Sequence, residues 1–388
     1  MVDSNFNNEY TQRPFTVVED IINRHFTVVS TSYQPIQGKD GTPLFVPVYE
    51  VLKRSDLSQS MKLAIQELEN IGYIALLREH PELSDSRVYL IVREFRPKVG
   101  TKRSPNTLPI VLFVATVASV FVFGFVAFGF GSMFNIVDVL LYVIGLMGIV
   151  GIHESGHLLA SRRHKIQASL PYFIPMPLFL GTMGAFINQR TPLRDRNALF
   201  DLGISGPLAG LIVSIIAVII GVFISPVVLE ANLPEGTTTL VDYMGFGIIF
   251  YDILSSTVAS FRYIPDGYTL ILHPLAFAGW VGLVITGLNL IPVGQLDGGH
   301  VARSLLNQNV HRIVTYIAAF LMIIIGFFFM AMLILFFYMW AGHPGPLDDV
   351  GKVTNSRKVI AIALFAFALI CIPLPTEFYY LVIQFLGL

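Results

Sequence analysis

Long apolar runs dominate the chain after residue 106 and set its architecture. Each run is near or above the roughly 20 residues that a helix needs to cross the hydrocarbon of a bilayer. The last run is the least regular, because Pro373 and Pro375 interrupt it. The pattern predicts about six membrane-spanning helices, at residues 107–129, 134–160, 198–226, 271–296, 313–340 and 358–386.

The pattern before residue 99 has other periods and predicts a small soluble domain ahead of the membrane part. Residues 1–13 are polar and rich in Asn, as in a flexible tail, whereas residues 14–98 have the changing hydrophobic periods of an α+β fold. No metal cluster, Gly-rich phosphate loop or nucleophile motif occurs in this stretch of sequence, so we expect a regulatory or partner-binding domain. Helices are expected at 16–25 and 57–71, and strands at 26–33, 43–51, 73–78 and 87–95, with a turn at 38–41.

Basic residues mark one predicted side of the membrane. Cytoplasmic loops carry an excess of Lys and Arg, and all of the basic clusters fall on one side if the N-terminus is cytoplasmic. These clusters lie at 93–103, 162–165, 190–196 and 303–312. The loop at 227–270 is acidic and falls on the opposite side. We therefore expect a multi-pass integral protein of a prokaryotic cell membrane, with a cytoplasmic domain at 14–98, a basic linker at 99–106 and a membrane domain at 107–388.

Composition supports the membrane assignment and limits the partners. The chain is 54% hydrophobic and 13% charged, which is too apolar for an ordinary soluble enzyme of 388 residues. Its formal net charge of -1 gives no basic excess for nucleic acid, so the lipid bilayer is the expected partner surface. A lone cysteine, Cys371, lies in an apolar run and cannot form an internal disulfide.

The segment at 166–190, between the second and third predicted spans, is too apolar for a solvated loop and too rich in Pro and Gly for a membrane helix. We interpret it as a re-entrant β-hairpin. Non-helical backbone at membrane depth needs protein or a water-filled cavity beside it, so the hairpin is expected to line the site. An amphipathic loop that rests on the lipid headgroups is the alternative that composition leaves open.

The sequence His-Glu-Ser-Gly-His lies near the end of the second predicted span. Its i, i+4 spacing puts His153 and His157 on one helical face, where both can bind one zinc ion, with Glu154 placed as a general base. Ionisable groups inside a membrane helix are expensive and usually functional. The alternative is that the two histidines only hydrogen-bond neighbouring helices. Gly206 and Gly210 allow close helix approach, and we expect them to bring the third span against this helix.

Catalytic zinc normally takes three protein ligands, so a third ligand is needed. The stretch at 289–300 ends the fourth predicted span on the same predicted side and offers two candidates, Asp297 and His300. Pro292 would break the helix and aim the carboxylate inward, and the glycines after Asp297 would let the backbone pass close to another helix. The alternative for this stretch alone is a membrane helix that simply ends in a turn.

Together the two segments resemble the site-2 protease family of intramembrane zinc metalloproteases. The pattern of that family is a His-Glu-x-x-His helix followed by Asn-x-x-Pro-x-x-x-x-Asp-Gly, and both halves match this sequence. The resemblance covers about 134–305. It implies a membrane protease with one zinc ion, held by the side chains of His153, His157 and Asp297.

The resemblance also implies the chemistry. Glu154 would be the general base and Asn289 would help to stabilise the oxyanion, while His300 would lie outside the ligand set. The hairpin at 166–190 would present an edge strand to an unwound substrate. The implied activity is regulated intramembrane proteolysis, the zinc-dependent cleavage of single-span or membrane-anchored proteins within or near their transmembrane segments. A catalytically silent zinc-holding scaffold or metal carrier is the alternative, and such a site would not need the Glu154 carboxylate.

Overall fold

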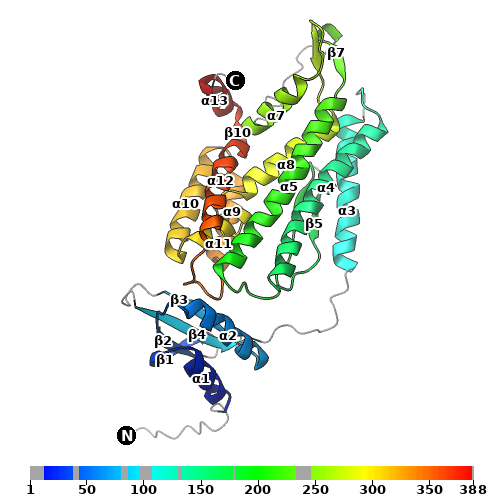
Figure 1. Ribbon diagram of the computed structural model, residues 1–388. Helices are drawn as coiled ribbons and strands as arrows, with labels where there is room; N and C mark the ends of the chain where they lie inside the picture. The colour runs from blue at the N-terminus through cyan, green and yellow to red at the C-terminus, as the bar shows by residue number, and fades with distance from the viewer. Residues whose placement is uncertain are drawn as a thin grey trace. The chain divides into compact units, whose positions relative to one another are not determined.

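The computed structural model describes residues 13–37, 43–79, 86–95, 107–129, 133–177, 180–232 and 246–386. The predicted turn at 38–41 and the basic linker at 99–106 lie outside these residues, as does almost all of the predicted tail at 1–13. The chain forms two compact units, whose elements are labelled in Figure 1. The N-terminal unit consists of residues 1–101, 191–197 and 345–353, and the membrane unit consists of residues 102–190, 198–344 and 354–388.

A four-stranded antiparallel sheet and two helices form the body of the N-terminal unit, with the strand order β1-β2-β4-β3. The second helix buries apolar side chains three or four positions apart, such as Met61, Ile65 and Leu68. This is the spacing of one helical face. The predicted elements are confirmed, with ends that differ by a few residues. They are α1 (Arg13–His25), β1 (Val28–Gln37), β2 (Pro43–Leu52), α2 (Leu57–Asn70), β3 (Tyr73–Arg78) and β4 (Arg87–Glu94).

Isolated β-bridges join two short segments from far along the chain to the β3 edge of this sheet, the first to β3 and the second to the first. The backbone N–H of Leu77 in β3 donates to the carbonyl oxygen of Leu347 over 2.8 Å, which adds the segment at 345–353 to the sheet. The N–H of Leu347 in turn donates to Leu193 O over 2.8 Å, which adds the segment at 191–197. The Leu347 side chain is buried in the same apolar core as the strands. The N-terminal unit is therefore built from three separate parts of the chain.

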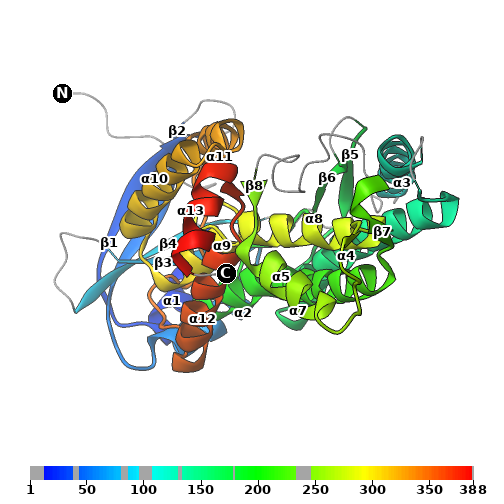
Figure 2. The same ribbon diagram turned by 90° about the horizontal axis from the view of Figure 1, so that it is seen from above.

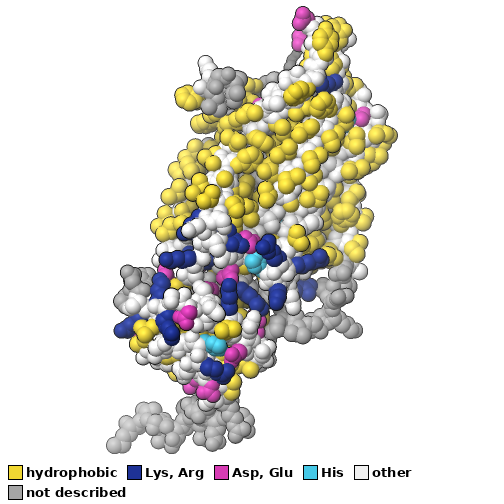
Figure 3. Space-filling model, in the orientation of Figure 1, with side chains coloured by type: hydrophobic (Ala, Val, Ile, Leu, Met, Phe, Trp, Pro, Cys, Tyr) yellow, Lys and Arg dark blue, Asp and Glu magenta, His cyan; other side chains and the backbone are white. Residues whose placement is uncertain are grey.

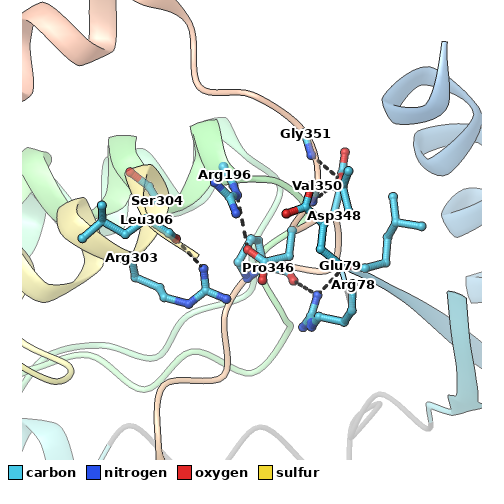
Figure 4. Close-up of polar contacts among 12 residues, drawn as sticks. Arg78, Glu79, Arg196, Arg303, Ser304, Leu306, Pro346, Asp348, Val350 and Gly351 are labelled. Atoms are coloured by element: carbon cyan, nitrogen blue, oxygen red, sulfur yellow. Dashed lines mark hydrogen bonds and ion pairs between the residues drawn. The ribbon is translucent and has the colours of Figure 1, made fainter. Parts of the chain in front are cut away.

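Charged side chains also hold these segments in the N-terminal unit (Figure 4). Arg78, the last residue of β3, donates from Nη1 to Pro346 O over 2.8 Å. Arg196 Nε lies 3.3 Å from Asp349 Oδ1, so this ion pair joins one added segment to the other. Both partners are largely shielded from water, and shielded pairs are screened by salt less than exposed ones. The segments are thus fixed by backbone pairing, by core packing and by charge.

Three long helices of the membrane unit are apolar and long enough to cross a bilayer: α3 (Thr107–Phe128), α4 (Ile136–Arg163) and α5 (Arg196–Ile224). They run side by side in Figure 1. Hydrophobic side chains cover the visible face of these helices in Figure 3, as expected of a surface that contacts lipid. The first three predicted spans are confirmed as helices of spanning length.

The structure shortens the first of the other three predicted spans and divides the last two. The run at 271–296 ends as a helix at Asn289, and another helix begins after a turn. Gly326 interrupts the next run with a φ of 94°, a conformation that helices do not contain. Proline residues interrupt the last run as expected. The resulting helices are α8 (Pro274–Asn289), α9 (Asp297–Leu305), α10 (Gln308–Ile324), α11 (Phe328–Ala341), α12 (Asn355–Cys371) and α13 (Thr376–Leu386). The count of six spans stays a prediction.

A β-hairpin follows α4 inside the segment at 166–190. Its strands β5 (Tyr172–Met176) and β6 (Gly181–Phe186) pair antiparallel. A Cβ at Gly181 would lie 2.4 Å from Cα of Val120, so the start of β6 is in direct contact with α3. The predicted hairpin is confirmed, and its re-entrant position in a membrane stays a prediction.

Smaller elements lie at the ends of the helices of the membrane unit, and Figure 2 shows α7 close to α5 in this unit. Besides the β5–β6 hairpin, two short antiparallel strand pairs occur among the described residues, β7 with β9 and β8 with β10. The bounds of these elements are β7 (Val227–Leu229), a 3-10 turn (Glu230–Asn232), β8 (Phe246–Gly247), α7 (Ile249–Ala259), β9 (Tyr268–Leu270) and β10 (Leu374–Pro375).

Candidate metal centre

Helix α4 carries the first part of the candidate site. Its start is fixed by a capping box, in which Asn135 accepts from the first turn and Asp138 accepts from the backbone N–H of Asn135. The helix then continues to Arg163, and it keeps His153 and His157 one turn apart on one face. Both imidazoles are buried, with 5% and 7% of their surface exposed.

The structure brings three potential ligand groups together at this point. His153 Nε2 lies 3.2 Å from His157 Nε2. Asp297 completes the group, with one carboxylate oxygen 3.2 Å from His153 Nε2 and the other 3.3 Å from His157 Nε2. Zinc holds nitrogen and oxygen ligands at about 2.1 Å in a tetrahedron, which places neighbouring ligand atoms about 3.4 Å apart. The three side chains therefore fit a zinc ion and leave a fourth position for another ligand.

The backbone carbonyl of Leu202 selects the tautomer of the neutral His157 ring. His157 Nδ1 lies 2.9 Å from Leu202 O, and a carbonyl oxygen can only accept, so Nδ1 carries the proton. In the neutral ring the lone pair then lies on Nε2, the nitrogen that is 3.3 Å from a carboxylate oxygen of Asp297. His153 differs, because its Nδ1 is buried without a hydrogen-bond partner among the described residues.

Glycines bring α5 directly against the two histidines of α4. A Cβ at Gly206 would lie 2.1 Å from His157 Nε2, and a Cβ at Gly210 would lie 3.1 Å from His153 Nδ1. On the other helix, a Cβ at Gly156 would lie 2.3 Å from a backbone oxygen of α5. The prediction that Gly206 and Gly210 bring the third span against the His-Glu helix is confirmed.

Glu154 lies beside the ligand atoms and is buried, with 4% of its surface exposed. One of its carboxylate oxygens lies within 4.8 Å of a ring nitrogen of His153 and of a ring nitrogen of His157. A carboxylate at this distance can exchange a proton with a water molecule held between it and the ligand atoms. The arrangement therefore combines a metal-binding group with a potential proton acceptor.

Asp297 is the first residue of α9, a helix of nine residues. A Cβ at Gly298 would lie 2.1 Å from Leu290 O, so the first turn of α9 lies directly against the turn that ends α8. The close approach that we expected at the glycines after Asp297 is present, but its partner is this turn rather than the side of a helix. Close approach to the side of a helix comes from α5, where a Cβ at Gly203 would lie 2.8 Å from Asp297 O.

Two other predicted site residues lie outside the group of ligand atoms. His300 follows Asp297 by one turn, and its Nδ1 lies 2.8 Å from His343 Nε2. The geometry therefore favours Asp297 over His300 as the third ligand. Asn289 is the last residue of α8 and is partly buried. Among the described hydrogen bonds it makes none with His153, so its part in the chemistry stays a prediction.

Sequence reasoning missed two buried histidines behind α9. His343 follows α11 with 5% of its surface exposed, and His311 lies on α10 with none exposed. Their ring centroids are 5.2 Å apart. A weak signal was present for His343, which stands between Gly342 and Pro344 at the end of an apolar run. His311 carried no signal, because a single polar position near the start of an amphipathic helix is common.

The chain matches a family model over the region that holds this site. The model is that of Peptidase family M50, and residues 141–333 match it. Both motifs lie within that range, the first on α4 and the second at the start of α9. No solved structure matches the chain.

Several plant proteins named as zinc metalloproteases are similar to this chain. "Probable zinc metalloprotease EGY1, chloroplastic" of Arabidopsis thaliana is 33% identical over 165 residues, which are 42% of this chain and 29% of the relative. EGY1 of Oryza sativa subsp. japonica is 35% identical over 158 residues, 40% of this chain and 26% of the relative. EGY2 of Arabidopsis thaliana is 29% identical over 238 residues, 59% of this chain and 41% of the relative.

The chain thus spans less than half the length of each of these relatives. The residues that match the family model, 141–333, include both motifs, which meet at one buried point. On the match to the family model, residues 141–333 belong to Peptidase family M50, the family of the site-2 proteases.

Proposed function

We propose that this protein is an intramembrane zinc metalloprotease that cleaves membrane-anchored proteins within or near their transmembrane segments. One observation carries the proposal. The two imidazole nitrogens lie 3.2 Å apart and each lies within 3.3 Å of one oxygen of the same carboxylate, in a unit whose long helices are apolar enough to cross a bilayer. The relatives named as zinc metalloproteases support the same activity.

The proposed zinc ligands are His153, His157 and Asp297, for one ion per chain. Imidazole nitrogen and carboxylate oxygen are ligands that catalytic zinc takes, with three from the protein and one position left open. The hydrogen bond from His157 Nδ1 to Leu202 O supports this assignment, because ligand histidines are commonly held by such a bond. A bound zinc ion supplies Lewis acidity, which makes water more acidic and a peptide carbonyl more reactive.

Glu154 is the proposed general base. Its carboxylate takes a proton from the water molecule that attacks the peptide carbonyl, and it returns that proton to the amine when the C–N bond breaks. Asn289 would donate a hydrogen bond from its side-chain amide to the oxyanion that forms on the carbonyl oxygen. Its position at the end of α8, just before the turn that leads to Asp297, supports this role.

The β5–β6 hairpin suggests how a helical substrate becomes accessible. The carbonyls of a transmembrane helix are bonded within the helix, so a substrate must unwind locally before it is attacked. Among the described residues the hairpin is a sheet of only two strands, which leaves each strand one edge for pairing. An unwound substrate segment can pair with such an edge. We therefore infer that the hairpin is re-entrant and lies beside the site in a domain of about six spans.

The orientation in the membrane rests on charge. Basic clusters at 162–165 and 190–196 and the acidic loop at 227–270 support a cytoplasmic N-terminal domain. The relatives are named as chloroplastic proteins, so they give no support to the expected prokaryotic cell membrane. The substrates we infer are single-span or membrane-anchored proteins.

Replacement of Glu154 by Gln tests the proposal. The full-length protein, loaded with zinc in lipid vesicles, is incubated with a single-span protein that carries helix-breaking residues. Glu154→Gln should reduce the cleavage rate by about 100-fold or more while the zinc content of the protein stays near that of the wild type. Glu377→Gln, which changes an exposed glutamate on α13, is the matched control and should cleave normally.

Two results would count against the proposal. Full cleavage by Glu154→Gln would rule out this residue as the base. A wild-type protein that binds zinc but cleaves no membrane-anchored protein would favour the silent scaffold or metal carrier instead.

A further inference from the structure

Helix α9 is too short to hold its own position. It has nine residues, and its N-cap residue, Leu296, makes no capping hydrogen bond with its side chain. Helices shorter than about 12 residues are marginal in isolation, so contacts with the rest of the protein must fix such a helix. The carboxylate of Asp297 sits at the first position of α9, and its place therefore depends on what holds the helix.

Two buried histidines that are not part of α9 hold it by hydrogen bonds. His343 Nε2 lies 2.8 Å from His300 Nδ1. His311 Nε2, on α10, lies 3.1 Å from Gly299 O and donates to it, because a carbonyl only accepts. His343 and His311 are each at most 5% exposed. A buried polar group that loses its partner is unfavourable, so these bonds select one position of α9.

The side chain of His300 relates this network to Asp297. The two residues are three positions apart, which places them on the same face of α9. Gly203 of α5 packs against that face, since a Cβ there would lie 2.8 Å from Asp297 O and 3.0 Å from His300 Cβ. α5 therefore limits α9 on one side, and His343 holds it through the His300 ring.

We propose that His343 is a positioning residue for the metal site: through its hydrogen bond to His300 it fixes the rotation of α9 and so the place of the Asp297 carboxylate opposite the α4 histidines. This inference rests on the proposed function, because it assigns His343 to the same zinc site. It names no new ligand. Both nitrogens of His311 already have partners, Nε2 with Gly299 O and Nδ1 with the Tyr338 hydroxyl at 3.5 Å. The imidazoles of His300, His311 and His343 are therefore not all free to hold a second ion.

The test compares two replacements of His343 in the full-length protein. His343→Phe keeps a ring of similar volume and removes the hydrogen bond, whereas His343→Gln keeps a nitrogen near the position of Nε2. Zinc affinity is measured by competition with a chelator in the Glu154→Gln background, where catalysis does not interfere. Loss of a residue that orients a ligand weakens metal binding by about 10- to 100-fold. We expect this loss for His343→Phe and recovery for His343→Gln.

A kinetic measurement separates positioning from general damage. At saturating zinc and with Glu154 present, His343→Phe should lower kcat and leave KM unchanged. His273→Phe is the matched control, because His273 is also buried and hydrogen-bonded, to Asp138 at 3.1 Å. Asp138 precedes His153 by about 22 Å of helix, so this variant should lower thermal stability and keep zinc affinity.

Three outcomes would overturn the inference. Unchanged zinc affinity and unchanged kcat in His343→Phe would leave the proposed protease intact and remove the role of His343. A wild-type stoichiometry of two zinc ions, reduced to one in His343→Phe, would make the histidine cluster a second metal site. If His343→Phe fails to fold, His343→Asn replaces it, since that amide is too short to reach His300. Equal zinc affinity of the Asn and Gln variants would then refute the positioning role.

Discussion

The candidate metal centre joins two helices that reach the same point in different ways. α4 is a continuous helix of 28 residues, and the relation between His153 and His157 follows from its geometry alone. α9 has nine residues, and Asp297 reaches the histidines only because glycines and distant histidines fix that helix. A site of this kind has a rigid half and a half that depends on its surroundings. The α4 half should lose zinc binding only when the helix face that carries the two histidines is obstructed. The α9 half should also lose zinc binding when residues far from the site are replaced.

The largest effect is expected where α5 meets the rigid half. Gly206→Ala would add a Cβ 2.1 Å from His157 Nε2, the proposed ligand atom, so one of the two must move away. A displacement of about 1 Å can cost about 100-fold in rate, so we expect at least that loss of cleavage and a loss of bound zinc. Zinc per chain and cleavage rate are the measurements.

Gly148→Ala is the control for that replacement. Gly148 lies on α4, and a Cβ there would meet nothing within 4 Å. It should keep zinc and activity, because alanine is the better helix former. Normal zinc content in Gly206→Ala would show that α5 does not set the histidine face.

A smaller loss, of about 10- to 100-fold in zinc affinity, is expected at the dependent half. Gly298→Ala would add a Cβ 2.1 Å from Leu290 O, and a backbone oxygen cannot move aside as a flexible side chain can. The start of α9 should shift and take Asp297 with it. Chelator competition measures the loss, with Gly151→Ala as the control because that position is open. If Gly298→Ala binds zinc normally, α9 is less dependent on its turn than we infer.

The smallest effect should leave the metal site unchanged and lower only stability. Arg357 of α12 donates twice to Asp201 of α5, with both distances 2.7 Å, and His164 at the end of α4 lies 2.9 Å from the same carboxylate. Arg357→Lys cannot make the double contact, and hydrogen bonds to charged groups contribute about 1.5–3 kcal/mol. We expect a loss of that size or less in detergent unfolding, with unchanged zinc affinity. Lys358→Arg, at an exposed neighbour, should change neither quantity.

The same contrast explains what the sequence could predict at the site. The residues of α4 were predictable because a motif on one helix contains its own geometry. Asp297 required a resemblance, since nothing local distinguished it from His300. His343 and His311 were not predicted, because their roles arise from packing between α9, α10 and the end of α11 rather than from a pattern.

The fold likewise has parts that the sequence predicts and parts that it does not. The elements of the N-terminal unit and the first three long helices follow directly from hydrophobic periods. The later runs were expected as single spans, and prolines gave a visible reason for a break in two of them, Pro292 in the first and Pro373 and Pro375 in the last. Gly326, with its φ of 94°, separates α10 from α11, and it adopts this conformation in the packing of the folded protein. A glycine inside an apolar run does not by itself predict such a break. The two segments that are joined to the sheet at the β3 edge could not be predicted, because they lie far from β3 in sequence.

The extension of that sheet has a consequence for how the protein is made. Ribosomes release the N-terminal end first, so β3 is complete long before Leu347 is synthesised. Until then the N–H of Leu77 has no strand to pair with on its open side. An unpaired strand edge readily pairs with other chains. The N-terminal unit can be completed only after α11 has been synthesised. Its assembly therefore follows the synthesis of most of the membrane unit.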